Sequence, residues 1–205
     1  MKKLLISLAI VCALLSCGKQ TELKENTASS DTIVSEDKKP DTVPAFTKEL
    51  SLYNTSFKIS VTGNQMTIIP KDLKIDNNPI ITEIEGTVTN AEIGDLNSDT
   101  FPELFVYTVS EGSGSYGKAY GFSVNNGKSV SGISIPALAD DPKLSKGYMG
   151  HDEFAIVDGI LAQRFPIYNE GDTNSKPTGK TRQIQYKLRE GEASRKLVVD
   201  QTIEF

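Results

Sequence analysis

Residues that could carry out hydrolytic chemistry are few in this 205-residue chain, and His151 is its only histidine. A Ser–His–Asp triad would need His151 beside Ser113 or Ser115, with a carboxylate orienting its other ring nitrogen. The adjacent Asp152 would point to the opposite face of a strand. A zinc site would need further nitrogen or sulfur ligands that the rest of the domain does not supply. The sequence therefore predicts a protein that is not an enzyme and carries no cofactor.

A second group of residues resembles the start of a calcium loop. Asp95, Asn97 and Asp99 place oxygen-bearing side chains at alternate positions, which suits a hard cation. The pattern then departs from the EF-hand, because Thr100 stands where glycine is needed and Val106 where the terminal glutamate is needed. We favour an Asx-rich turn before a strand. A calcium- or carbohydrate-binding β module on the cell envelope is the alternative function.

The segment SEGSGSYGKAYG, residues 110–121, contains four glycines, three serines and two tyrosines between two strand-like segments, residues 103–109 and 119–124. Glycines permit positive φ angles and let the backbone approach a partner closely. Hydroxyls and aromatic rings are common in binding loops. The composition indicates a loop that contacts a partner rather than one that transforms a substrate. An ordinary hairpin connection is the alternative.

The elements that carry these residues follow a signal peptide and a tether. Lys2 and Lys3 precede an apolar stretch, residues 4–15, which is shorter than the ~20 residues that cross a bilayer. It ends in LLSC, which resembles a lipobox whose cysteine accepts diacylglycerol. We expect residues 1–17 to be a lipoprotein signal peptide with lipidation at Cys17. The protein is then expected to be a lipoprotein of the cell envelope, at the outer membrane and facing the periplasm. Residues 18–44 are polar and predict a flexible tether.

Charge and cysteine content limit what the mature domain, residues 45–205, can do. Cys12 and Cys17 are the only cysteines and lie in the signal, so no disulfide is expected despite export. Removing the signal with its Lys2 and Lys3 leaves 20 basic against 27 acidic residues in the mature chain, residues 18–205, a net charge of −7. An acidic domain does not suit nucleic-acid binding.

Alternating apolar and polar residues run through most of the domain, as in Phe57, Ile59 and Val61. Half-buried strands have this pattern. Turn signals such as residues 125–127, NNG, separate the segments, and no long amphipathic helix is evident. The sequence predicts an all-β, antiparallel two-sheet β-sandwich, with a closed barrel as the alternative.

The second half of the chain contains a set of short motifs that are specific in combination: residues 94–97 (GDLN), 102–104 (PEL), 112–117 (GSGSYG), 138–142 (LADDP), 147–154 (GYMGHDEF), 164–168 (RFPIY), 177–179 (PTG), 182–188 (RQIQYKL) and 191–194 (GEAS). With these motifs the chain, from Glu92 to the C-terminus, resembles the periplasmic inhibitors of invertebrate-type (i-type) lysozyme. Residues 45–91 match these inhibitors only in their strand pattern.

The resemblance implies a non-enzymatic β-sandwich that can form a homodimer and whose partner is an i-type lysozyme. In this family, a protruding Ser-Gly loop that ends in tyrosine enters the lysozyme's substrate cleft. That role carries over to Ser113, Gly114 and Tyr116, with Ser115 and Gly117 shaping the loop. The lipobox is a departure, since members of the family are described as soluble periplasmic proteins.

Overall fold

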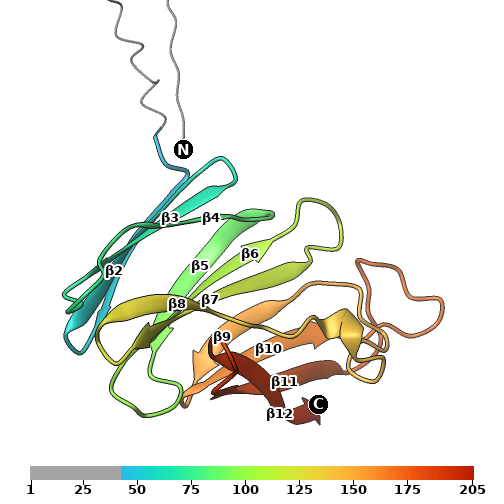
Figure 1. The fold of residues 1–205 in the computed structure, drawn as a ribbon. Helices are drawn as coiled ribbons and strands as arrows, with labels where there is room; N and C mark the ends of the chain where they lie inside the picture. Colours follow the sequence, from blue (N-terminus) through green and yellow to red (C-terminus); the bar gives the residue numbers. More distant parts are fainter. Residues whose placement is uncertain (1–42) are drawn as a thin grey trace, which may run out of the picture. The chain divides into compact units, whose positions relative to one another are not determined.

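The computed structural model describes residues 43–205, which all belong to one unit of the chain, Asp41–Phe205. Its strands form three four-stranded antiparallel sheets, each a meander of neighbouring strands (Figure 1). The N-terminal sheet consists of β1 (Phe46–Leu52), β2 (Thr55–Thr62), β3 (Gln65–Lys71) and β4 (Ile80–Glu83). The central sheet consists of β5 (Thr87–Gly94), β6 (Glu103–Val109), β7 (Gly117–Asn125) and β8 (Ser129–Ile133). The C-terminal sheet consists of β9 (Glu153–Val157), β10 (Ile160–Pro166), β11 (Thr181–Arg189) and β12 (Lys196–Glu204).

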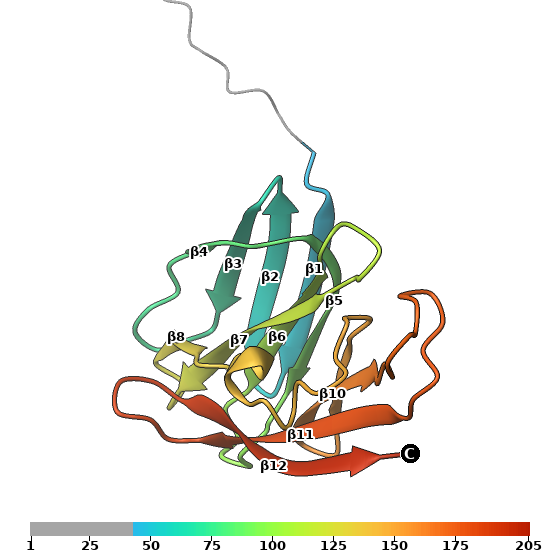
Figure 2. The same ribbon diagram turned by 90° about the vertical axis from the view of Figure 1, so that its right-hand side faces the viewer.

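The all-β antiparallel fold predicted from the sequence is confirmed, but the number of sheets is three rather than two. The central sheet lies between the other two (Figures 1 and 2). Its strand β6 is buried from Glu103 to Thr108 without alternation. Leu104 and Val106 pack in the same cluster as the N-terminal sheet, whereas Phe105 and Tyr107 pack with the C-terminal sheet. A strand covered on both faces has apolar side chains pointing both ways, so a two-sheet sandwich does not account for it.

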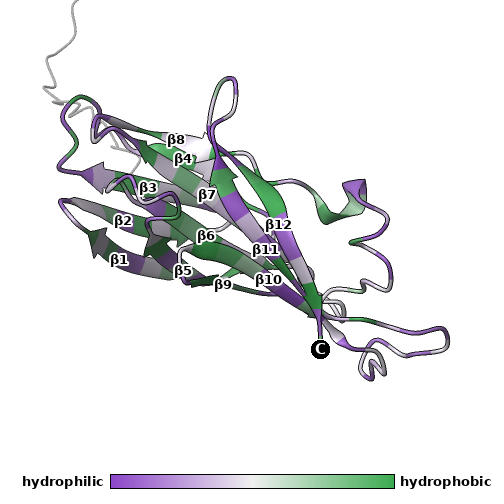
Figure 3. Cartoon of the chain, turned by 90° about the horizontal axis from the view of Figure 1, so that it is seen from below, coloured by the Kyte–Doolittle hydropathy of each residue, from purple (hydrophilic) through white to green (hydrophobic). Residues whose placement is uncertain are grey.

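The strands of the N-terminal sheet alternate between more buried and more exposed side chains, as half-buried strands do. In β2, Phe57, Ile59 and Val61 are buried while Lys58 is exposed. Figure 3 shows hydrophobic colour concentrated in the strands and hydrophilic colour in many of the connections. The only helix among the described residues is a short 3₁₀ turn, Leu138–Asp140, after β8, and no helix in this part of the chain has the length and apolar character needed to cross a membrane.

A buried ionic cluster joins the central sheet to the segment before β12. Arg195, only 9% exposed, places Nη1 3.1 Å from Oε1 of the fully buried Glu103 and Nη2 2.6 Å from Oδ2 of Asp99. Its Nε lies 3.1 Å from Glu190 Oε1. Burial raises the pKa of the Glu103 carboxyl, while a hydrogen bond from the Leu96 amide opposes that rise. The Arg195–Glu103 pair joins two layers through charges that have little access to water.

Candidate functional site

The glycine-rich segment forms the connection between β6 and β7 and projects beyond the ends of these strands (Figure 1). Ser113 is exposed, and Tyr116 is 49% exposed although it is a large aromatic residue. The Ser113 hydroxyl makes no hydrogen bond to any part of the chain that the structure describes. The structure therefore presents Ser113, Gly114, Ser115 and Tyr116 together on one protruding loop.

The loop is fixed by hydrogen bonds at its base and from two distant segments. The Ser110 amide donates to the Tyr116 carbonyl at 2.8 Å, and the Tyr116 amide donates to Ser110 Oγ at 2.9 Å. The His151 amide donates to the Gly114 carbonyl at 2.8 Å. The side-chain amide of Asn174 donates to the Ser113 carbonyl. A loop held at its base and at its middle keeps one conformation, which lowers the entropy that it loses on binding.

Two glycines allow the close approaches on which this conformation depends. A Cβ added to Gly114 would lie 2.4 Å from the ring of Tyr116, so this position must lack a side chain for the tyrosine to fold over it. Gly150 has φ +90°, and a Cβ there would lie 1.9 Å from the Gly114 carbonyl oxygen. The tyrosine ring meets Tyr148 edge to face, with centroids 5.6 Å apart.

Replacement of Gly150 by alanine is expected to destabilise the fold by at least about 2 kcal/mol, or to displace the loop. The left-handed backbone costs an L-residue about 1–2 kcal/mol, and the collision with the Gly114 carbonyl adds to that cost. Gly171→Ala is the matched control, because Gly171 has φ +88° with nothing within 4 Å of its added Cβ. Chemical denaturation of both variants measures the difference. Equal destabilisation would show that the Gly150–Gly114 approach does not constrain the loop.

A partly buried carboxylate, Asp152, orients the end of the loop. The Gly117 amide donates to Asp152 Oδ2 at 2.8 Å, and the Tyr148 hydroxyl donates to the same oxygen at 2.5 Å. Gln163 Nε2 donates to Oδ1 at 2.7 Å, and Gln163 Oε1 accepts from the Tyr186 hydroxyl at 2.8 Å. Burial raises the pKa of the Asp152 carboxyl, and these hydrogen bonds oppose the rise. Sequence reasoning considered Asp152 only as a neighbour of His151 and missed this role, because its partners lie far apart in the chain.

The structure does not assemble the catalytic triad that His151, Asp152 and the loop serines could have formed. The His151 ring stacks on Tyr168 with centroids 6.3 Å apart, and Nε2 is buried without a hydrogen-bond partner among residues 43–205. The Asp152 oxygens are engaged by the Gly117 amide and by Tyr148 and Gln163. His151 approaches the loop through its backbone amide, at φ +60°. Its backbone amide contributes to the position of the loop.

The side-chain oxygens of Asp95, Asn97 and Asp99 are used within the turn. Asp95 Oδ1 accepts from the Asp99 amide at 3.1 Å, and Oδ2 accepts from the Thr100 amide at 3.0 Å. Asp99 Oδ2 accepts from Asn97 at 2.8 Å and pairs with Arg195. Within the described part of the chain, no group of three or more His, Cys, Asp or Glu residues is arranged to hold a metal ion. This geometry is that of an Asx turn that caps the start of the strand.

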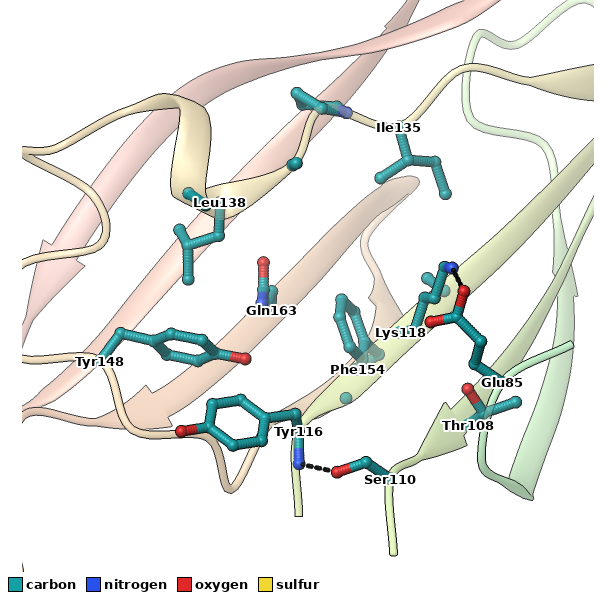
Figure 4. A pocket seen from close by; sticks show the side chains of 15 residues that line it. Glu85, Thr108, Ser110, Tyr116, Lys118, Ile135, Leu138, Tyr148, Phe154 and Gln163 are labelled. Atoms are coloured by element: carbon teal, nitrogen blue, oxygen red, sulfur yellow. Dashed lines mark hydrogen bonds and ion pairs between the residues drawn. The ribbon is translucent and has the colours of Figure 1, made fainter. Parts of the chain in front are cut away.

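An open groove of about 400 Å³ lies beside the base of the loop (Figure 4). Tyr116 and Tyr148 form one end of it, and Lys118, paired with Glu85 at 3.1 Å, lies toward the other. Apolar side chains form much of the remaining wall: Ala119, Ile135, Leu138 and Phe154. This groove could not be predicted from the sequence, because its walls come from segments that do not adjoin in the chain.

In comparisons with known proteins, no family model, no curated protein and no solved structure matches this chain. Cys17, the expected lipidation site, lies outside the described residues. Functional inference therefore depends on the geometry of the loop and on the residue motifs of the chain.

Proposed function

We propose that this protein is an inhibitor of i-type lysozyme, and that the Ser113–Tyr116 loop occupies the lysozyme's substrate cleft. The observation that carries the proposal is an exposed loop held in one conformation, with a free Ser113 hydroxyl and a half-exposed Tyr116 at its surface. A loop that is fixed before binding loses little conformational entropy in a complex.

The chemistry of a lysozyme cleft suits this loop. Such a cleft is concave and carries a catalytic acid and a second carboxylate. A serine hydroxyl donates a charge-assisted hydrogen bond to a carboxylate, which is stronger than a bond between neutral groups. Tyr116 adds rigid contact area with one polar end, as aromatic anchors do in interfaces. Because the loop offers no glycosidic bond, the lysozyme cannot cleave it.

Inhibition assays with i-type, chicken-type and goose-type lysozymes, run side by side with the purified protein, test the proposal. We expect the i-type enzyme to be inhibited at concentrations that leave the other two largely active. Failure to inhibit the i-type enzyme at any concentration would remove the proposed function.

We also propose that a lipid on Cys17 holds the inhibitor at the outer membrane, facing the periplasm, where it protects peptidoglycan. The support is the basic start, the short apolar stretch and the LLSC sequence. Cys17→Ser is expected to abolish fatty-acid labelling, because serine lacks the thiol that accepts the lipid. The variant should accumulate as an unprocessed precursor or appear in the soluble envelope fraction. Normal labelling and membrane fractionation of Cys17→Ser would contradict lipidation, and Cys12→Ser serves as the matched control.

A further inference from the structure

Half of strand β7 has a free edge. Strand β8 pairs with β7 only from Gly121 to Asn125, whereas β6 pairs with it from Gly117 to Ser123. After β8 the chain leaves β7, since the Ser134 amide donates to the Arg195 carbonyl at 3.0 Å and its carbonyl accepts from the Leu197 amide at 2.8 Å. Within the described part of the chain, residues 117–120 therefore have a neighbouring strand on one side only.

In an antiparallel ladder, successive residues of a strand direct their N–H and C=O groups alternately toward one neighbouring strand and away from it. This alternation identifies the main-chain groups that point out from the free edge of β7. The Ser110 amide donates to the Tyr116 carbonyl, and the Val124 amide donates to the Pro102 carbonyl, so the even-numbered residues of β7 bond toward β6. The N–H and C=O of Ala119 consequently point away from β6. They face the groove, of which Ala119 is a lining residue.

The groove beside this edge combines apolar walls with a free polar group. Ile135 and Leu138, on the segment that leaves β8, face Phe154 across it (Figure 4). Thr108 Oγ1 is buried, lies in the same lining and has no hydrogen-bond partner among the described residues. An extended peptide presents main-chain hydrogen-bonding groups along one edge and alternating side chains above and below.

We propose that the free edge of β7 binds an extended peptide segment of the protein that receives the loop, adding it to the central sheet as a strand. The Ala119 amide and carbonyl provide its main-chain hydrogen bonds, and an apolar side chain of the segment packs against Leu138 and Ile135. This inference rests on the proposed function and names a second contact with the same target.

The groove is continuous with the loop, and this continuity identifies the protein that would occupy the groove. Tyr116, Ser110 and Gly117 belong both to the loop hairpin and to the groove lining, so a protein whose cleft surrounds the loop also brings its cleft rim to the groove. A second copy of this chain fits less well, because two mature chains of net charge −7 repel each other. The free edge is also only four residues long, which suits a short rim segment.

Hydrogen exchange of the full chain, alone and with an i-type lysozyme, tests this contact directly. We expect the Ala119 amide to exchange at least about 10-fold more slowly in the complex, since a strand hydrogen bond must open before exchange. Leu138→Lys should weaken inhibition about 10-fold, because it removes an apolar contact and places a charge in the groove. Ile81→Lys is the matched control, being the same type of change at an exposed edge-strand residue outside the groove, and should leave inhibition unchanged.

The outcomes separate this inference from the function on which it rests. If the protein inhibits fully but the exchange rate of the Ala119 amide is unchanged in the complex, the proposed strand contact is wrong while the loop mechanism remains. The same conclusion follows if the Leu138→Lys variant inhibits as well as the parent protein. Protection of Ala119 that rises with protein concentration in the absence of lysozyme would assign the edge to a second copy instead. Absence of any inhibition would remove both proposals.

Discussion

Tyr116→Ala and Ser113→Ala are each expected to weaken inhibition of an i-type lysozyme about 30-fold, with the melting temperature almost unchanged. Truncation of a central interface residue typically costs ~2 kcal/mol or more of binding free energy, which corresponds to roughly 30-fold in affinity. Both side chains lie on the exposed loop, and the Ser113 hydroxyl bonds to nothing within the described chain. Surface changes of this kind usually alter the free energy of unfolding by about 0.5 kcal/mol or less.

Inhibition constants and melting temperatures, measured on the same preparations, show whether the variants lose inhibition without losing stability. Tyr53→Ala is the matched control, because Tyr53 is 58% exposed, lies in the turn between β1 and β2 and is not part of the loop. It should leave inhibition unchanged, and the Ser113/Tyr116 double variant should inhibit more weakly than either single one. If the folded loop variants inhibit as well as the parent protein, the loop is not the inhibitory element.

The largest effect on stability is expected for Arg195→Met, at roughly 3–5 kcal/mol near pH 7. Methionine leaves the Glu103 carboxylate buried, fully inaccessible to water and without its cationic partner. Asp99 loses its partner in the same step. Denaturant unfolding of the variant and the parent protein gives the difference in the free energy of unfolding.

The loss of stability in the Arg195→Met variant should depend on pH, because the Glu103 carboxylate can be protonated. Burial already raises its pKa in the folded protein above the ordinary 4.5, and removal of Arg195 raises it further. A folded-state pKa above the unfolded one means that stability falls as the pH rises from the unfolded value through the folded value. The destabilisation by Arg195→Met should therefore be smaller at pH 5 than at pH 7.

Glu103→Gln combined with Arg195→Met provides the control for this interpretation. Glutamine keeps the size of the side chain and can still accept the hydrogen bond from the Leu96 amide, but it buries no charge. We expect the double variant to recover part of the lost stability and to lose the pH dependence between 5 and 7. A double variant as unstable as Arg195→Met alone would show that the buried charge is not the cause.

The sequence by itself determined the local features of this protein. The alternation of Phe57, Ile59 and Val61 corresponds to the buried face of β2, and the turn signal NNG lies between β7 and β8, where Asn126 and Gly127 both have positive φ. The protruding loop was also identified, because a dense run of glycine and serine between two strands can be recognised without any knowledge of the fold. Strand period and turn chemistry depend on neighbouring residues, so they can be predicted from a single sequence.

Only the tertiary structure decided how many sheets stack and what holds the loop. The uninterrupted burial of β6 indicates a strand covered on both faces, yet an apolar run alone does not say which sheets cover it. The loop is fixed by Gly150, His151 and Asn174, and its end by Asp152, all from segments beyond β8. Arg195 and Glu103 meet across 92 residues of chain. Such contacts depend on the packing of whole sheets against one another, and that packing is set by the combined burial of many side chains rather than by any local pattern.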